Sequence, residues 1–366
     1  MCSAQLSQNK LYRLQQNKTG VESGSLDLSK FDYDLPESLV AQEPPEQRGD
    51  SRLMVVRLGS DKLEHRCFSD LLNYLNPGDI LVVNDTKVLP ARLLGKKEDT
   101  WAQVEVLLLK RLFGNRWESL VRPGKRLKAG SRVTFGGGLL KCQILDSTDY
   151  GGRIVQFFYE GSFEEVLDRV GVMPLPPYIK KPLLDRRRYQ TIYARQAGSA
   201  AAPTAGLHFS HQLLGRIAAM GVNVATVLLH VGLGTFRPVE VEDIRRHHMH
   251  AEYYEIPEPS VAAIEKARAR GGKVIAVGTT TTRCLESASG DGGSVRSGSG
   301  GTDIFIYPGY RFKAIDGLIT NFHLPKSTLL MMVSALAGRE KILRAYREAI
   351  RENYRFYSFG DAMLII

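Results

Sequence analysis

At 366 residues the chain is long enough for two domains, and its 43% hydrophobic and 24% charged residues are typical of a soluble globular protein. It shows no apolar stretch near about 18 residues, no apolar signal-peptide core and no C-x-x-C pair, so we expect a cytoplasmic protein without a membrane span, disulfide framework or thiolate zinc site. The formal net charge of +10 favours encounter with polyanions, nucleic acid among them, although charge alone discriminates weakly.

The N-terminal part divides into an extension and the start of a folded domain. Residues 1–26 are rich in Gln, Ser, Asn and Gly without a sustained period, which predicts disorder. A strand is predicted over residues 52–58, and Asp50 and Arg52 stand at its entrance. This acid and this guanidinium form either a salt-bridged turn or one arm of a site.

Three polar residues interrupt the next apolar strand. Asn84, Asp85 and Thr86 follow the run ILVV, and polar groups in a buried run need hydrogen-bond partners. A turn or a ligand could supply those partners.

Residues 88–172 differ from the rest of the chain in their sequence pattern. Short β-rich runs alternate with Gly, Asn, Asp and Pro, which predicts a small antiparallel barrel or sandwich. Its many basic residues, Arg92 among them, suit a charged exterior as well as an RNA-facing strip. We read this segment as an insertion, so that residues 27–87 and 173–366 form one discontinuous α/β domain.

Two candidate ligand loops follow the insertion. A small-residue turn carries Thr204 and His208 and leads into an amphipathic helix. A buried strand then ends in a glycine turn. The residues of interest in that turn are His230, Gly232, Gly234 and Thr235. Glycines let a backbone approach a ligand closely, although a lone G-x-G is a weak signal.

A histidine cluster comes next in the chain. His247, His248 and His250 lie within four positions, with Glu252 two residues beyond. The nearby carboxylates lack a typical zinc spacing, so we predict no metal. One imidazole that transfers a proton or holds a ligand is the favoured reading.

Two strand–loop–helix units complete the chain. In the first, Thr279, Thr280, Thr281, Thr282 and Arg283 follow a strand and a glycine, and hydroxyls and first-turn amides there can hold a ribose or an anion. Residues 289–301 then form a flexible loop.

The second unit spans residues 316–338. Its strand ends at Asn321, a turn carries His323 and Lys326, and a helix begins at Ser327 or Thr328. This arrangement favours an anionic ligand group, or else it is a capped core helix with a solvated lysine. Near the C-terminus Asp361 sits in an aromatic turn, where backbone N–H groups could satisfy its carboxylate.

These units together predict an architecture. Alternating strands and helices indicate an α/β main domain with a mixed sheet flanked by helices, plus the inserted antiparallel β-barrel. Ligands of such sheets gather at the carboxyl ends of the strands, so the polar loops are expected to share one cleft.

Eight motifs carry a resemblance to a known family: NDTKVLPAR, AAPTAGLHF, HVGLGTFRPV, HHMHAEYYEIP, VGTTTTRCLES, TDIFIYPGYRFK, DGLITNFHLPKSTLLMMVSALAG and YRFYSFGDAML. Together they resemble the S-adenosylmethionine:tRNA ribosyltransferase-isomerase family of queuosine biosynthesis. The resemblance implies a monomeric transferase that moves and isomerises the ribosyl part of S-adenosylmethionine. The acceptor is 7-aminomethyl-7-deazaguanine at the tRNA wobble position, and the products are epoxyqueuosine, adenine and methionine. It also implies no metal or prosthetic group, with S-adenosylmethionine as a consumed co-substrate and the anticodon stem–loop as the RNA partner.

Roles for the candidate residues follow from that implied chemistry. The expected catalytic set combines a pool of histidines for proton handling with one carboxylate, and the base among them stays open: His208, His230, His250, His323 and Asp361. The expected binding set serves ribose, methionine, adenine, the deazaguanine and phosphates: Asp50, Arg52, Asn84, Asp85, Arg92, Thr204, Gly232, Gly234, Thr235, Thr279, Thr280, Thr281, Thr282, Arg283, Asn321, Lys326, Ser327 and Thr328.

Two other functions remain as alternatives. A basic RNA-binding module without catalysis would retain tRNA but release no adenine. A kinase-like enzyme built on the Lys326 turn is disfavoured, because the sequence lacks the Walker motif and an acidic magnesium cluster.

Overall fold

The structure is a computed structural model that describes residues 26–148, 151–232 and 239–366. The predicted extension therefore lies almost wholly outside the described residues. Gly234 and Thr235 lie outside them as well.

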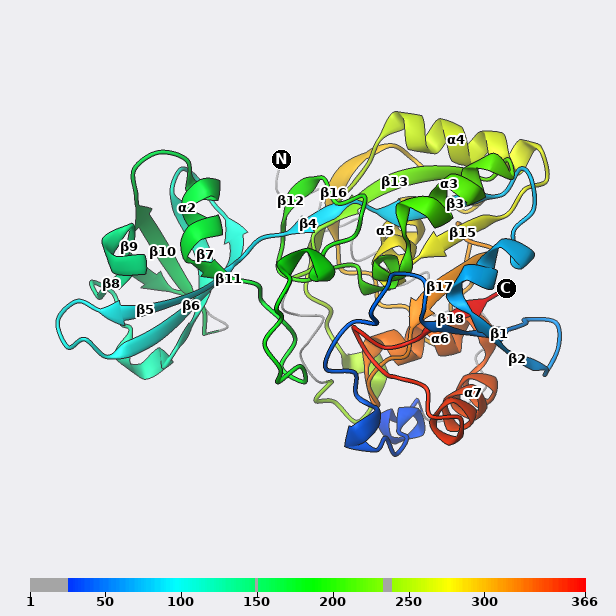
Figure 1. Cartoon of the computed structure of the whole chain (residues 1–366), viewed down its shortest axis with the longest axis horizontal. Helices are drawn as coiled ribbons and strands as arrows, with labels where there is room; N and C mark the ends of the chain where they lie inside the picture. Colours follow the sequence, from blue (N-terminus) through cyan, green and yellow to red (C-terminus); the bar gives the residue numbers. More distant parts are fainter. Residues whose placement is uncertain (1–25, 149–150, 233–238) are drawn as a thin grey trace.

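A mixed sheet forms the centre of the larger domain (Figure 1). Strands β13, β3, β15 and β17 run parallel, β18 is antiparallel to β17, and β1 is parallel to β18. Strands β3, β15 and β17 are buried along their whole length, as expected for parallel strands covered on both faces. Within the described residues the strand order is β16 (Gly298–Thr302), β14 (Glu252–Ile256), β13 (Asn223–Leu229), β3 (Ile80–Asn84), β15 (Val274–Val277), β17 (Gly317–Asn321), β18 (Ala362–Ile365), β1 (Arg52–Val56) and β2 (Leu63–Cys67).

Helices cover both faces of this sheet, which confirms the predicted α/β class. Successive strand residues point to opposite faces, so Val82 packs in one core and Val83 in the other. On the second face Leu213 and Ile217 of α3 (His211–Ala219) pack with residues of the 3₁₀ helix η3 (Phe68–Tyr74). The first face is covered by α4 (Glu258–Ala269), α5 (Thr279–Ala288), α6 (Thr328–Ala337) and α7 (Arg339–Arg351).

The inserted segment forms a closed antiparallel β-barrel with its own core, which also confirms the prediction. Burial alternates along β6, as it must when every second side chain fills the barrel. Val106 and Phe157 belong to that core, as do Phe163, Val166 and Leu167 of α2 (Phe163–Val170). The closed order is β5 (Arg92–Lys97), β6 (Gln103–Arg111), β7 (Arg116–Arg122), β10 (Arg153–Phe158), β9 (Leu140–Ser147) and β8 (Arg132–Phe135), with β11 (Gly171–Val172) on β5.

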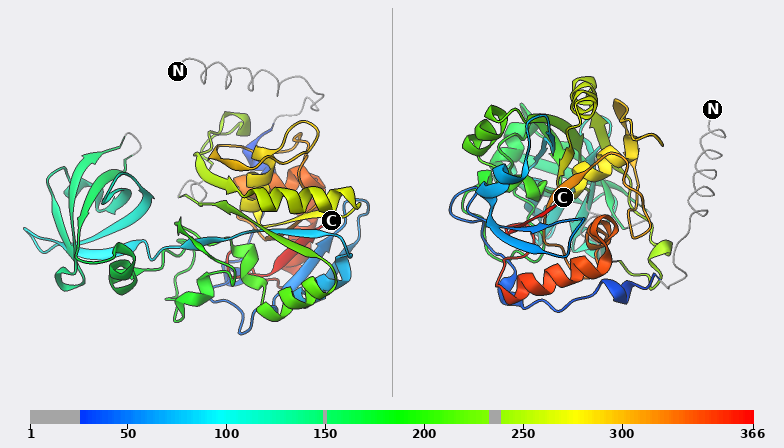
Figure 2. Two further views of the ribbon diagram at one scale, coloured as in Figure 1. Left: turned by 90° about the horizontal axis from the view of Figure 1, so that it is seen from above. Right: turned by 90° about the vertical axis from the view of Figure 1, so that its right-hand side faces the viewer.

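The barrel stands beside the larger domain as a separate lobe (Figures 1 and 2). Strand β4 (Thr86–Val88) leads into it and pairs in parallel with β12 (Gln196–Ser199). The remaining short 3₁₀ helices are η1 (Leu28–Phe31), η2 (Glu37–Leu39), η4 (Gly124–Arg126), η5 (Gly136–Gly138), η6 (Arg186–Tyr189), η7 (Thr204–His208) and η9 (Ile244–Arg246). In the described part of the chain, none of the helices combines the length and apolar character needed to cross a membrane.

Parallel pairing brings the ends of four strands to one edge of the sheet. Strands β3, β13, β15 and β17 all end at this edge, and the loops that follow them carry most of the polar residues singled out in the sequence. The edge is the expected location of a ligand site in an open α/β sheet.

Candidate active site

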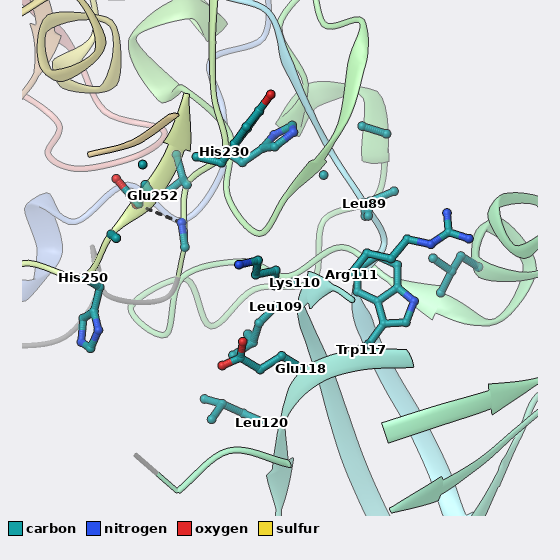
Figure 3. Close-up of a pocket in the computed structure, with 18 of the residues that line it drawn as sticks. Leu89, Leu109, Lys110, Arg111, Trp117, Glu118, Leu120, His230, His250 and Glu252 are labelled. Carbon is teal, nitrogen blue, oxygen red and sulfur yellow. Dashed lines mark hydrogen bonds between the residues drawn. The ribbon is translucent and has the colours of Figure 1, made fainter. Parts of the chain in front are cut away.

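A pocket of about 660 Å³ lies between the barrel and the larger domain (Figure 3). The barrel supplies a wall in which apolar side chains alternate with charged ones, and the larger domain supplies part of β12, the loop after β13 and the start of β14. The barrel side includes Leu109, Lys110, Arg111, Trp117, Glu118, Leu120, Phe163 and Glu164, and the facing side includes Gly198, His230, Val231, Gly232, His250, Glu252 and Tyr253.

His230 follows β13 and is held in a fixed orientation at this pocket. Its Nδ1 lies 2.8 Å from the Thr86 hydroxyl, and its ring stacks on Tyr253 with centroids 6.0 Å apart. Gly198 leaves room for the ring, because a Cβ at that residue would lie 2.7 Å from Nε2. Burial lowers the pKa of His230 below its ordinary value of 6.5, although Asp85 acts in the opposite direction. The imidazole is therefore neutral at pH 7.

A buried ion pair supports the adjoining wall. Arg283 of α5 contacts the Glu252 carboxylate, and their side chains are 3% and 4% exposed. Glu252 also accepts a hydrogen bond of 2.9 Å from the Gly232 N–H. Arg283 thus acts on the pocket through Glu252 and Gly232, and its charge is not available to a ligand there.

A second, smaller pocket of about 90 Å³ lies at the same sheet edge. Val231 lines both pockets, so the two adjoin. The N-termini of α5 and α6 both open here: Thr279 and Thr280 belong to the first turn of α5, and Ser327 caps α6. Two helix N-termini at one pocket favour an anionic group such as a carboxylate. Thr204, Asn321 and His323 also line this pocket.

The helix start predicted at Ser327 or Thr328 is confirmed, with Ser327 as the N-cap. The Ser327 hydroxyl accepts a hydrogen bond of 3.1 Å from the Leu330 N–H, and α6 begins at Thr328. Lys326 lies just outside the small pocket, where its Nζ is 2.7 Å from Asp32.

Asn84 joins three elements below the two pockets. Its Nδ2 donates to the Leu229 carbonyl at 2.9 Å and to the Thr280 hydroxyl at 3.2 Å. Its Oδ1 accepts from the N–H groups of Leu229 and Thr86, each at 3.1 Å. The amide therefore fixes the ends of β3 and β13 against the start of α5.

Two of the four candidate histidines are buried and hydrogen-bonded to hydroxyls. His208 Nδ1 lies 2.6 Å from the Ser51 hydroxyl, and its Nε2 lies 3.3 Å from Asn321 Nδ2. His323 Nε2 lies 2.8 Å from the Thr320 hydroxyl. Burial lowers the pKa of each to about 3, so both are neutral at pH 7.

These buried histidines predict acid-sensitive folding. The unfolded chain takes up protons at both rings below pH 6.5, whereas the folded chain does so only near pH 3, so stability falls as pH drops through this interval. Each ring costs about 2 kcal/mol of unfolding free energy between pH 7 and pH 5. Urea titrations at both pH values should show a smaller loss for His208→Gln than for the unsubstituted protein. An equal loss in both proteins would contradict this explanation.

Asp361 and Arg52 form a structural contact away from both pockets. The Asp361 carboxylate accepts hydrogen bonds of 2.8 Å from the backbone N–H groups of Arg52 and Arg355. The Arg52 guanidinium lies over the Tyr354 ring, 3.7 Å from its centroid. Backbone N–H groups thus satisfy the Asp361 carboxylate, which is the structural role that its place in an aromatic turn allows.

Replacing Asp361 with alanine should lower the unfolding free energy by about 1–3 kcal/mol, because two N–H groups lose their acceptor. Urea denaturation measures the change, with the exposed Asp291→Ala as a matched control. A loss no larger than that of the control would argue against the structural role.

Other candidate binding residues also lie outside both pockets. Asp85 pairs with Arg195 at 2.8 Å, and Arg92 pairs with Glu105 on the barrel at 2.9 Å. Asp50 is exposed at a loop. The hydroxyls of Thr281 and Thr282 donate to the carbonyls of Val277 and Gly278 in the preceding turn at 2.8 Å and 3.3 Å.

His250 lies at the margin of the large pocket and is exposed. Its neighbour His247 packs edge-on against Phe305. No group of three or more His, Cys, Asp or Glu side chains is arranged to hold a metal ion in residues 26–148, 151–232 and 239–366.

The sequence pattern does not identify several residues at or beside the large pocket. Trp117 and Leu109 belong to alternating barrel strands, and that pattern shows which segments are strands but not which surface meets the other domain. Thr86 holds His230 without lining either pocket, and the sequence marks it only as a polar interruption and as part of the motif NDTKVLPAR. Gly198 belongs to none of the eight motifs. Gly198 is marked only by its close contact with the His230 ring, and that contact exists only in the folded chain.

Comparisons with known proteins agree on one family. A family model described as queuosine biosynthesis protein matches residues 28–365. The chain is 72% identical over 341 residues to an S-adenosylmethionine:tRNA ribosyltransferase-isomerase of Pelotomaculum thermopropionicum, covering 93% of this chain and 100% of that protein. It is 62% identical to the protein of the same name from Desulforamulus reducens, with the same coverage. A crystal structure of an S-adenosylmethionine tRNA ribosyltransferase from Thermotoga maritima superposes with a TM-score of 0.54 at 39% identity, covering 92% of this chain and 100% of that one.

Proposed function

The chain belongs to the S-adenosylmethionine:tRNA ribosyltransferase-isomerase family of queuosine biosynthesis, and from this premise we propose the full reaction that it catalyses. It transfers and isomerises the ribosyl part of S-adenosylmethionine onto 7-aminomethyl-7-deazaguanine at the wobble position of tRNA. The products are epoxyqueuosine in the tRNA, free adenine and free methionine. S-adenosylmethionine is consumed as a co-substrate, and the anticodon stem–loop is the part of the tRNA that binds.

The observation that carries this proposal is the pair of adjoining pockets, in which His230 lines the large pocket next to Val231, the residue that lines both. The large pocket, at about 660 Å³, has the volume of a small-molecule site, and the apolar side chains in its mixed wall, Leu109 and Leu120 among them, suit flat bases. The small pocket receives two helix N-termini, which suits the methionine carboxylate. Methionine in the small pocket places ribose and adenine in the large one, beside the incoming deazaguanine.

His230 is the residue we assign as the base. If Nδ1–H donates to the Thr86 hydroxyl, Nε2 is left with a lone pair that can accept a proton. Its lowered pKa keeps the ring neutral, as a base requires. His208 and His323 are neutral too, but His208 lines neither pocket, and His323 lines only the small pocket, which takes the methionine end in this proposal.

The chemistry then follows from the sulfonium. Its positive charge acidifies the neighbouring ribose carbon, and His230 takes the proton from that carbon. As the proton leaves, its electron pair forms a double bond to the adjoining ring carbon, whose bond to the ring oxygen breaks. That oxygen forms a carbonyl at the carbon that carried adenine, so adenine leaves with the electron pair of its bond and takes up a proton. The substrate amine adds to the double bond at the ring carbon and loses a proton, which returns an electron pair to the carbon beside sulfur. This carbon bonds to the carbonyl carbon and closes a five-carbon ring, and the resulting alkoxide displaces the sulfonium, so the epoxide closes as methionine leaves as a neutral thioether. The chain supplies orientation and one proton acceptor for these steps.

Adenine release tests this function most simply. S-adenosylmethionine should yield adenine when tRNA carrying 7-aminomethyl-7-deazaguanine is present, and no adenine with unmodified tRNA or without tRNA. Retention of tRNA without adenine release would instead favour an RNA-binding module. Filter retention of labelled tRNA in the same reactions separates the two outcomes.

A further inference from the structure

The turn between β6 and β7 exposes an aromatic side chain beside the large pocket. Phe113 is 92% exposed and Leu112 is 38% exposed. A single exposed apolar residue needs no explanation by itself. This one lies two residues beyond Arg111, which lines the pocket, so about 7 Å of extended chain separates them.

The turn is held in place on both sides. The Leu112 N–H donates to the Arg116 carbonyl at 2.8 Å, which closes the hairpin. Asn115 is anchored to the neighbouring strand: its carbonyl accepts from the Phe157 N–H at 2.9 Å, and its Oδ1 accepts from the Tyr159 hydroxyl at 2.8 Å. Phe113 is therefore presented to solvent by a fixed turn.

The charges around Phe113 are all positive within the turn. Residues 110–116 contain Lys110, Arg111 and Arg116 and no acidic residue. Lys110 and Arg111 line the large pocket, and Figure 3 labels both near Leu109 and Trp117 of the barrel. Arg111 also lies 3.4 Å from Glu164, and both of these side chains are about half exposed or more. An aromatic ring among cations matches the composition of single-stranded nucleic-acid sites, where bases stack on rings and phosphates meet cations.

An enzyme that acts on a base must draw that base out of its stack, which leaves a neighbouring base without a partner. An aromatic side chain can replace the lost stacking. We infer that Phe113 stacks on an anticodon-loop base adjacent to the reacting nucleotide while Lys110 and Arg116 contact the flanking phosphates. This inference rests on the proposed function, because it requires the anticodon loop to enter the large pocket.

The test uses an RNA stem–loop of the tRNA anticodon with 2-aminopurine beside the reacting position. Fluorescence titration should show that Phe113→Ala raises the dissociation constant about tenfold, whereas Phe113→Trp stays within about twofold of the unsubstituted protein. Trp101→Ala is the matched control, because Trp101 is a 66% exposed aromatic at the opposite end of β6. Trp101→Ala should leave the dissociation constant unchanged. Equilibrium dialysis should show unchanged S-adenosylmethionine binding in all variants.

The inference fails if Phe113→Ala binds the stem–loop as tightly as the unsubstituted protein, or if Trp101→Ala weakens binding equally. Either result would place the stacking contact elsewhere. Failure of the proposed function is distinguishable, because it would appear as absent adenine release by the unsubstituted protein, whatever the stem–loop affinities. Loss of stem–loop binding by the unsubstituted protein itself would overturn both.

Discussion

His230→Gln is expected to lower the single-turnover rate of ribosyl transfer by about 10²–10⁴-fold, the usual contribution of a positioned general base. Glutamine is close in size and can still hydrogen-bond to the Thr86 hydroxyl, so the change removes mainly the proton acceptor. Rapid quenching with quantification of adenine measures the rate, and a urea titration verifies that the fold is retained.

The matched control for this variant is His250→Gln. His250 lines the same pocket but is exposed, whereas the His230 ring is held by the Thr86 hydroxyl and by stacking on Tyr253. Its replacement should change the rate far less. A rate for His230→Gln that matches the unsubstituted protein would remove His230 as the base.

The pH dependence provides a second readout of the same assignment. A base must be unprotonated, so the rate rises with pH through the pKa of His230. Because burial lowers that pKa, the midpoint of the acid limb should lie below pH 6.5. This limb should disappear in His230→Gln. An acid limb unchanged in the variant would assign the titration to another group.

Arg283→Met should lower the free energy of unfolding by about 3–5 kcal/mol, because it leaves the Glu252 carboxylate buried without its counter-charge. Activity should fall as well, since Glu252 positions Gly232 at the large pocket. Urea denaturation followed by circular dichroism measures the stability.

Arg245→Met is the control for the buried pair, because Arg245 and Asp243 form an ion pair of the same charges at the surface. Its loss should have little effect on stability. Equal losses of unfolding free energy in the two variants would show that burial of the Arg283–Glu252 pair does not increase the cost of removing its arginine.

Much of the fold was predictable from local sequence pattern. Strand–loop–helix units and the β-rich segment with regular turns indicated the α/β sheet and the barrel, because side-chain periodicity reports which face of an element is buried. The same pattern located the loops at the carboxyl ends of the strands. His230, Thr279, Thr280, Asn321 and His323 do line adjoining pockets at that edge.

The roles of individual polar residues were less predictable, because the folded backbone competes with a ligand for each side chain. The Asp361 carboxylate accepts hydrogen bonds from two backbone N–H groups. The hydroxyls of Thr281 and Thr282 donate to the backbone carbonyls four residues before them. Arg283 lies inside the protein rather than at a ligand. Residue type and spacing do not distinguish these uses, whereas burial and hydrogen-bond partners do.

The most direct measurement of the central claim is mass spectrometry of nucleosides from tRNA that has reacted once with S-adenosylmethionine. The two-pocket site with His230 as base predicts that the deazaguanine nucleoside gains the mass of the ribose-derived epoxide unit, with one adenine and one methionine released for each nucleoside changed. A nucleoside of unchanged mass, or one that gains only a methyl group while S-adenosylhomocysteine accumulates, would contradict it.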